Sequence, residues 1–241
     1  MLEAGLWGFA AASALVIGAF IGLLGSVPRR FVAIAMAFGA GALISALAFD
    51  LTEDAFAQGG TLPVAAGLAA GALTFFAGDQ MLHRRGGARR GKRMKHGATN
   101  GPAIVLGAML DGIPESVVLG STLIAGGGMG LPFLAAVAIS NVPEALSAAA
   151  DLRREGHRPP WIIGLWVAVA VVSGVAAALG YALLGGMGAG AIPLIQAFAA
   201  GAILTMLSDT MIPEAFADGG DLTGLATVFG FATAFLLTTV G

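Results

Sequence analysis

The sequence predicts an all-α integral membrane protein in which eight transmembrane helices form a 3+2+3 arrangement with inverted repeats. Three observations predict this fold class. Of the 241 residues, 57% are hydrophobic and 11% are charged, and the mean hydropathy is +0.89, so the chain is far more apolar than a soluble domain. Apolar runs of membrane-spanning length recur along the chain, and a segment of the first half returns in the second half.

Eight apolar runs are long enough to cross a bilayer, whose hydrocarbon core of about 30 Å takes about 20 helical residues. We expect them at about 4–26, 31–52, 61–82, 101–124, 130–150, 160–184, 190–212 and 222–240, within one transmembrane domain over residues 1–241. We expect the first run to be a membrane span and not a cleavable signal peptide, because Glu3 precedes it and no Lys or Arg does.

The basic residues indicate the orientation of the chain in the membrane. All 12 Lys and Arg residues fall in the loops after the first, third and fifth runs: Arg29 and Arg30, then seven within 84–95, then Arg153, Arg154 and Arg158. In an eight-span chain these loops share one side, which the positive-inside rule makes cytoplasmic. The sequence therefore predicts a multi-pass protein of the cell (inner) membrane with both termini outside.

Residues 83–100 form the longest hydrophilic segment, a basic cytoplasmic loop. One interpretation is a mobile tether attracted to anionic lipid headgroups. The other is a regulatory metal-binding loop that uses His83 and His96, although two His residues among seven cations are a weak metal signal.

An internal repeat appears at an offset of 160 residues. Residues 37–62 align without gaps to residues 197–222, with 12 identities in 26 positions and a shared Ala-Phe-Ala-x-Gly-Gly ending. An odd number of spans separates the two copies, so they cross the membrane in opposite directions. Inverted repeats of this kind are common in secondary transporters, whose substrate sites lie near the bilayer midplane.

Two Pro-Glu motifs lie near the middle of the fourth and fifth runs. They are Asp111-Gly112-Ile113-Pro114-Glu115 and Ser140-Asn141-Val142-Pro143-Glu144. In each motif the first residue and the Glu are four apart, on one helix face, so both faces can converge on a cation at the midplane. A charged residue at the centre of a membrane helix costs about 2.5 to 3.5 kcal/mol, which favours pairing, a bound cation or a water-filled path.

The prolines free backbone carbonyls within both motifs. Pro114 and Pro143 lack an N–H, so the carbonyls of Leu110 and Ile139 lose their helical donors and can serve as further oxygen ligands. The alternative is structural: Pro and Gly are frequent in membrane helices, and a buried Glu can simply hydrogen-bond to a neighbouring span.

Two further acidic clusters lie at the ends of the second and seventh runs. Asp50, Glu53 and Asp54 fall near the outer end of the second run, and Asp209 and Glu214 near the inner end of the seventh. They are candidate ligands at the two mouths of an ion path. Ordinary interfacial carboxylates are the other interpretation.

The residue types argue against an intramembrane enzyme. The chain has no Cys, and His83, His96 and His157 all lie outside the apolar runs. A zinc protease would need His-Glu-x-x-His and a serine protease a membrane His, while an aspartyl protease would need Tyr-Asp, yet the only Tyr is followed by Ala182. We expect no enzyme activity, no resident cofactor and no nucleic-acid partner, and a bound metal held by oxygen or nitrogen atoms.

The Pro-Glu motifs resemble those of the ZIP (Zrt- and Irt-like) family of divalent-metal transporters. The usual family forms are His-Asn-x-Pro-Glu-Gly on span four and His-x-x-Pro-Glu on span five. The resemblance extends over the whole chain, with eight spans, outside termini and a variable loop after span three. Pro213-Glu214-Ala215 and the Asp50-x-x-x-Asp54-Ala55 pattern are similar to further family landmarks.

This resemblance implies a divalent cation, zinc or a similar ion, as the transported substrate, and a homodimer. By position, it implies metal-ligand roles for Asp111, Glu115, Ser140, Asn141 and Glu144. Asp111 and Ser140 stand where the family has His, Gly112 stands where it has Asn, and span six has no acidic residue. Oxygen in place of imidazole suits Mn, Fe(II) or Mg better than a His-bearing site would.

Three functions follow from these residues. The leading one is transport of divalent cations into the cytoplasm, with zinc favoured by the resemblance and Mn, Fe(II), Co or Cd as further substrates. We expect alternating access by one three-span repeat moving against the central spans. The alternatives are a cation or proton channel that uses the same carboxylates and, less favoured, an intramembrane enzyme.

Overall fold

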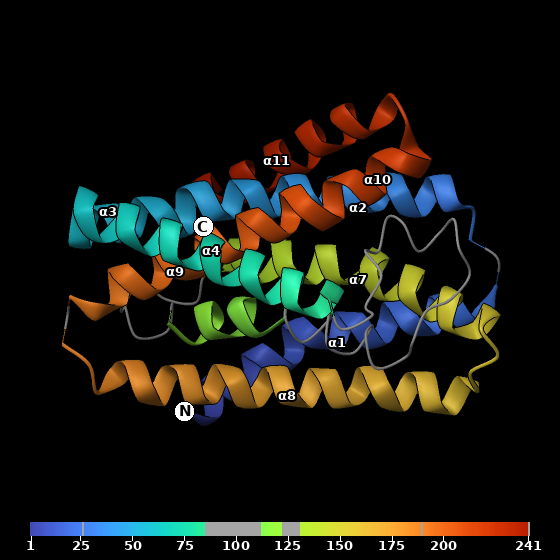
Figure 1. Cartoon of the computed structure of the whole chain (residues 1–241), viewed down its shortest axis with the longest axis horizontal. Coiled ribbons are helices and arrows are strands. Elements are labelled where there is room, and N and C mark those ends of the chain that lie inside the picture. Colours follow the sequence, from blue (N-terminus) through green and yellow to red (C-terminus); the bar gives the residue numbers. More distant parts are fainter. Residues whose placement is uncertain (26, 85–111, 122–130, 189, 241) are drawn as a thin grey trace.

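A computed structural model describes residues 1–25, 27–84, 112–121, 131–188 and 190–240. Within these ranges the regular structure is entirely helical. The helices lie roughly along one axis (Figure 1), with these bounds: α1 Leu2–Leu24, α2 Arg29–Ala46, α3 Glu53–Gly59, α4 Thr61–Arg84, α7 Leu131–Arg154, α8 Pro159–Gly185, α9 Ala191–Met206, α10 Ile212–Gly219 and α11 Leu222–Val240, with a further helical segment at 112–121.

Six stretches of the described residues are long and apolar enough to cross a membrane: Leu2–Leu24, Arg29–Gly59, Thr61–Met81, Leu131–Arg154, Pro159–Gly185 and Ala191–Gly219. A shorter apolar helix covers Leu222–Thr238. Large apolar side chains such as Leu183 and Phe229 are exposed, which suits contact with lipid. The chain is therefore a multi-pass membrane protein. Most of the expected span at 101–124, and the basic loop from residue 85 onward, lie outside the described residues.

Two of these stretches change helical pitch at matching positions. A π-helical turn at Leu47–Thr52 joins α2 to α3, and another at Leu207–Met211 joins α9 to α10. The turns begin 160 residues apart, at the offset of the sequence repeat. The spans that were expected to end near residues 52 and 212 are therefore longer than expected. In each of them the helix continues past the acidic residues that end the apolar run.

The two continuing helices also end alike. Gly60 has a φ of 74° and Gly220 a φ of 60°, in the left-handed region where glycine is favoured. Their N–H groups donate to the carbonyls of Phe56 and Phe216, at 2.8 and 3.1 Å. α2 and α9 run in opposite directions along the long axis (Figure 1). The similarity between the two sequence segments thus extends to their backbone conformation.

Glycines allow two further helices, α4 and α11, to pack closely on α9 and α2. A Cβ at Gly71 of α4 would overlap the carbonyl of Phe198 in α9, and a Cβ at Gly230 of α11 would overlap the carbonyl of Phe38 in α2. Phe38 and Phe198 are again 160 residues apart. α4 therefore packs on α9, and α11 packs on α2, as small residues in membrane helices allow.

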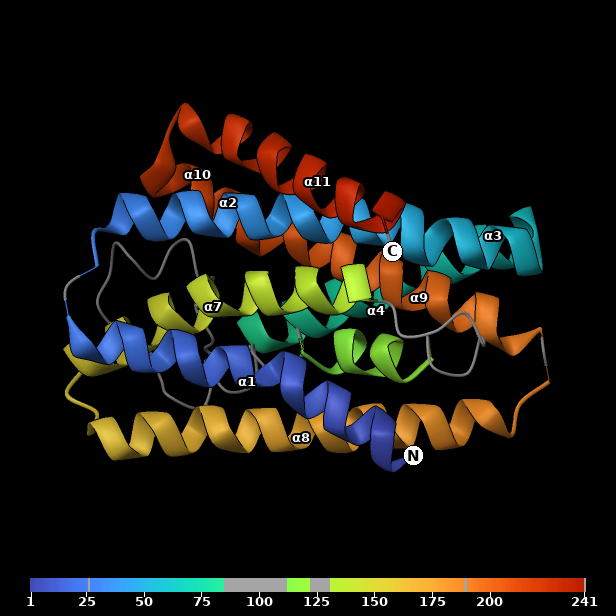
Figure 2. The same cartoon turned by 180° about the vertical axis from the view of Figure 1, so that it is seen from behind.

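The helices form two bundles. In the first bundle, α1 packs on both α7 and α8 (Figure 2), around a core that includes Ala19, Leu152 and Trp166. The second bundle contains α2, α3, α4, α9, α10 and α11. A larger apolar core joins it to the first bundle and includes Val118 and Phe133. The two bundles meet mainly along a seam between α2 and α7, where Gly39 approaches the backbone of Ser140.

Candidate functional site

A small cavity lies inside the first bundle, at the level of the Pro-Glu motifs. Its volume is about 10 Å³, close to the minimum that holds one water molecule. α1, the segment 112–121, α7 and α8 all contribute to its walls. The polar side chains that line it are Glu115, Ser116, Asn141, Glu144 and Ser173.

The segment 112–121 carries Glu115 into the cavity. Glu115 is 5% exposed, so its carboxyl group is well inside the protein. The Ser116 hydroxyl donates a 2.6 Å hydrogen bond to the Gly112 carbonyl, within the same turn. Gly120 is packed against the carbonyl of Ala177 in α8, so no larger residue fits there. This close packing fixes the position of the turn that holds Glu115.

α7 contributes Asn141 and Glu144, one helical turn apart. Asn141 is 5% exposed, and its Nδ2 donates a 3.4 Å hydrogen bond to the carbonyl of Ala11 in α1. The amide oxygen is then the atom with which Asn141 could bind a cation. Pro143 lies inside α7 and supplies no N–H to the carbonyl of Ile139. Glu144 is half-buried and lies on the same cavity wall.

Ser140 has a different position from the one expected for a ligand beside Glu144. Its hydroxyl donates to the Val137 carbonyl at 2.9 Å, and it is not among the residues that line the cavity. A Cβ at Gly39 would lie 2.8 Å from the Cα of Ser140, so this residue faces α2 at the seam. Asp111, the first residue of the other Pro-Glu motif and also an expected ligand, lies outside the described residues.

The candidate residues at the two mouths do not reach this cavity. Asp50 lies in the first π-helical turn, and within the described part of the chain its buried Oδ2 has no hydrogen-bond partner. Glu53 and Asp54 are exposed in the first turn of α3. The remaining two, Asp209 and Glu214, lie in the second π-helical turn and in α10. α3 and α10 are at opposite ends of the molecule (Figure 1), so the two clusters stay apart.

The donor set of the cavity consists of oxygen atoms. Among the described residues no three His, Asp or Glu side chains come together as a metal site. The cavity instead combines two carboxylates with an amide and two hydroxyls. Carboxylate, amide and hydroxyl oxygens suit hard divalent cations such as Mg and Mn. These oxygen atoms, on α7, α8 and the segment 112–121, are donors of the kind that a small, hard cation binds.

Ser116 and Ser173 are cavity residues that sequence reasoning missed. Ser173 is 4% exposed on α8, and a Cβ at Gly112 would lie 3.4 Å from its Oγ. A signal was present, because Ser173 and Tyr181 are the only hydroxyl-bearing residues in the apolar run 160–184. Ser116 directly follows Glu115, and helical geometry alone did not show that both border the same space.

Comparison with known proteins adds no relative. No protein-family model matches this chain, and no curated protein matches it. The geometry of the cavity, together with the motifs in the sequence, is therefore the basis for proposing a function.

Proposed function

We propose that this protein transports divalent metal cations across the membrane into the cytoplasm. One observation carries the proposal: buried Glu115 shares a small cavity with Glu144 and Asn141, within a bundle of membrane-spanning helices. Zinc is the substrate favoured by the resemblance to the ZIP family. Mn, Fe(II), Co and Cd are further candidates, of which Mn and Fe(II) suit the oxygen ligands of the cavity better than the soft cation Cd does.

The position of the two carboxylates supports an ion as cargo. Ionisable residues in membrane spans are rare, and they typically face a bundle interior and mark ion pathways. Two carboxylates that border one cavity repel each other when both are ionised, unless a cation or a proton lies between them. A divalent cation would neutralise both charges at once.

The proposal includes eight spans in a 3+2+3 arrangement with inverted repeats. The matched π-helical turns, the matched terminal glycines and the opposite directions of α2 and α9 support it. The segment 112–121 would belong to the fourth span and α11 would be the eighth. In secondary transporters built this way, the substrate site lies near the midplane, where this cavity is expected.

The packing indicates which helices would move together during alternating access. The cavity is built entirely from α1, the segment 112–121, α7 and α8. The second bundle is internally interlocked, because α4 packs on α9 and α11 on α2. We therefore propose that the first bundle carries the ion and moves against the second along the α2–α7 seam. This division differs from a three-span repeat moving against a central pair.

Metal uptake into proteoliposomes tests the function. Purified protein is reconstituted with a metal-sensitive dye inside the vesicles, and Zn, Cd, Mn, Fe(II), Co and Mg are added outside in turn. We expect uptake of at least one ion that saturates with concentration, because a carrier binds and releases one load per cycle. Vesicles without protein provide the background.

Two results would count against this function. If none of the ions enters above background, the protein is not a divalent-cation transporter. If flux rises without saturation and carries an electrical current at channel rates, the carboxylates belong to a channel.

A further inference from the structure

A charged pocket lies at the end of the molecule where α7 ends and α2 begins. Its volume is about 50 Å³. α1 and α7 form its walls on the side of the first bundle, and α2 and α10 form its walls on the side of the second. The pocket therefore lies across the seam, at the end that the basic residues mark as cytoplasmic.

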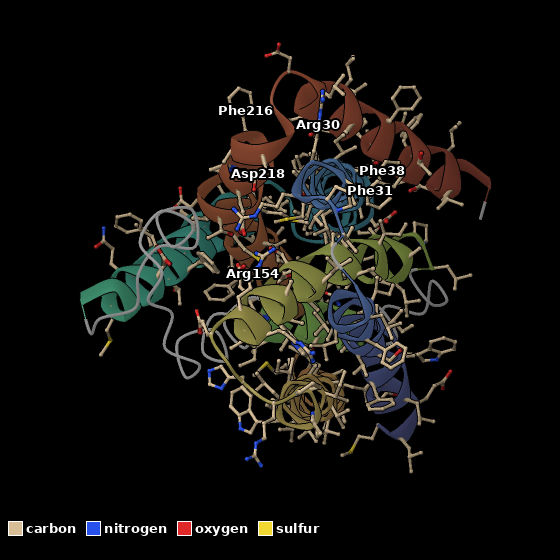
Figure 3. All side chains as sticks on the ribbon, turned by 90° about the vertical axis from the view of Figure 1, so that its right-hand side faces the viewer. Arg30, Phe31, Phe38, Arg154, Phe216 and Asp218 are labelled. Carbon is tan, nitrogen blue, oxygen red and sulfur yellow. The ribbon has the colours of Figure 1, made fainter. Side chains whose placement is uncertain are left out.

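Charged side chains of both signs line each side of this pocket. Asp151 and Arg154 come from α7, Arg29 comes from the start of α2, and Glu214 and Asp218 come from α10. Figure 3 looks onto this end and shows Arg154 on α7 and Asp218 on α10. The charges on the two bundles can thus attract each other across the seam.

One face of α7 leads from the cavity to this pocket. Glu144 lines the cavity, while Ser147, Asp151 and Arg154 line the pocket, three to four residues apart along the helix. Arg154 lies ten residues beyond Glu144, or about 15 Å at the rise of an α-helix. An ion that leaves Glu144 toward the cytoplasm would pass along this polar face.

Arg154 currently pairs within its own helix. Its Nη1 lies 2.9 Å from Oδ1 of Asp151, and the two side chains are 54% and 36% exposed. An exposed pair three residues apart on a helix is a weak interaction, so the guanidinium can change partner at little cost. Across the pocket, α10 presents Glu214 and, one turn later, Asp218. Asp218 lies in the last turn of α10, as Arg154 does in the last turn of α7, so these two side chains come from the ends of their helices.

We propose that Arg154 is the movable half of an inner gate. When the two bundles close at this end, it leaves Asp151 and pairs with Asp218 of α10, so that the pocket shuts between the cavity and the cytoplasm. Arginine suits this role because its planar guanidinium can bind a carboxylate through two hydrogen bonds. The inference rests on the proposed function, since an inner gate requires an ion that passes it.

A cysteine pair tests whether the gate closes. The natural chain has no Cys, so Arg154→Cys with Asp218→Cys introduces its only two thiols. A disulfide requires Cα atoms about 4.4 to 6.8 Å apart, a separation that gate closure should reach. Under mild oxidation in proteoliposomes we expect the bond to form and metal uptake to stop. Reduction should return uptake to the rate that the same double variant shows before oxidation.

The matched control is Arg153→Cys with Asp218→Cys. Arg153 is the neighbouring residue, is also exposed, and does not line the pocket. The proposal is overturned if the Arg154 pair fails to bridge, if the Arg153 pair bridges equally well, or if the bridged protein transports at its full rate. Bridging is scored without transport, so failure of the gate and failure of the proposed function are separable.

Charge exchange provides a second test that needs no cross-link. Arg154→Asp and Asp218→Arg should each slow uptake by about tenfold, and the double variant should recover most of the rate, as for two groups that interact directly. If the double variant is as slow as the singles, the two side chains do not pair, and the gate is contradicted.

Discussion

Replacement of Glu115 by Gln is expected to reduce metal uptake at least about a hundredfold, because even outer partners of metal ligands typically contribute 10 to 100-fold. The substitution keeps the volume of the side chain and removes its charge. Glu115 is 5% exposed and borders the cavity together with Glu144. A site with one carboxylate instead of two would bind a divalent cation much more weakly. Uptake into proteoliposomes at several metal concentrations measures the effect.

Ser140→Ala is the matched control for this prediction. Ser140 is also buried and polar and belongs to the second Pro-Glu motif, yet it faces α2 and hydrogen-bonds within its own helix. We expect its removal to leave uptake within about twofold, since a solitary hydroxyl that donates within its own helix contributes little net free energy. If Glu115→Gln transports normally, or if Ser140→Ala is the more damaging change, the assignment of the cavity is wrong.

Gly71→Ala is expected to destabilise the protein by about 1 to 3 kcal/mol, the usual cost of overpacking. A Cβ at this position would overlap the carbonyl oxygen of Phe198 and would lie 2.7 Å from its carbonyl carbon and 3.0 Å from the N of Ala202. These are backbone atoms of α9, so α4 and α9 would have to separate. Thermal unfolding in detergent, followed by loss of the monodisperse peak in size-exclusion chromatography, measures the change.

Gly164→Ala controls for the general effect of replacing a helical glycine. Gly164 lies on α8, and a Cβ there meets nothing within 4 Å. Alanine stabilises a helix by about 1 kcal/mol relative to glycine, so this variant should be as stable as the unmodified protein or more so. Equal stability of the Gly71 and Gly164 variants would contradict the close packing of α4 on α9.

The apolar runs predicted the helical class and the multi-pass character, because about 20 apolar residues leave a chain few options other than a membrane helix. They did not predict the ends of two spans. Asp50 and Glu214 interrupt the apolar pattern, but the helices continue through π-helical turns to Gly59 and Gly219. Backbone hydrogen bonding, rather than hydropathy, decides where such a helix ends.

The candidate site was predictable in part. Helical spacing predicted that the faces carrying Glu115 and Glu144 converge, and the structure places both residues beside one cavity. Spacing could not decide which way α7 faces, so it did not separate Ser140, at the seam, from Asn141, at the cavity. Ser173 was missed because its role depends on how α8 packs, which residue spacing does not encode.

The division of the helices into two bundles could not be predicted from the sequence either. The repeat predicted which segments resemble each other, but not that α4 would pack on α9 and α11 on α2. Those contacts depend on glycines such as Gly71 and Gly230, whose partners are backbone carbonyls far away in the chain. Small residues permit a close approach without specifying which helix approaches.

The central claim is that Glu115 and Glu144 hold a divalent cation in one cavity, and Mn²⁺ binding to the purified protein tests it most directly. Free hydrated Mn²⁺ has a sharp electron paramagnetic resonance signal that weakens on binding, so the bound stoichiometry can be measured without transport. We predict that the unmodified protein binds Mn²⁺ and that the Glu115→Gln, Glu144→Gln double variant loses at least one bound ion per chain. Equal stoichiometry for the two proteins, or no binding by either, would contradict the claim.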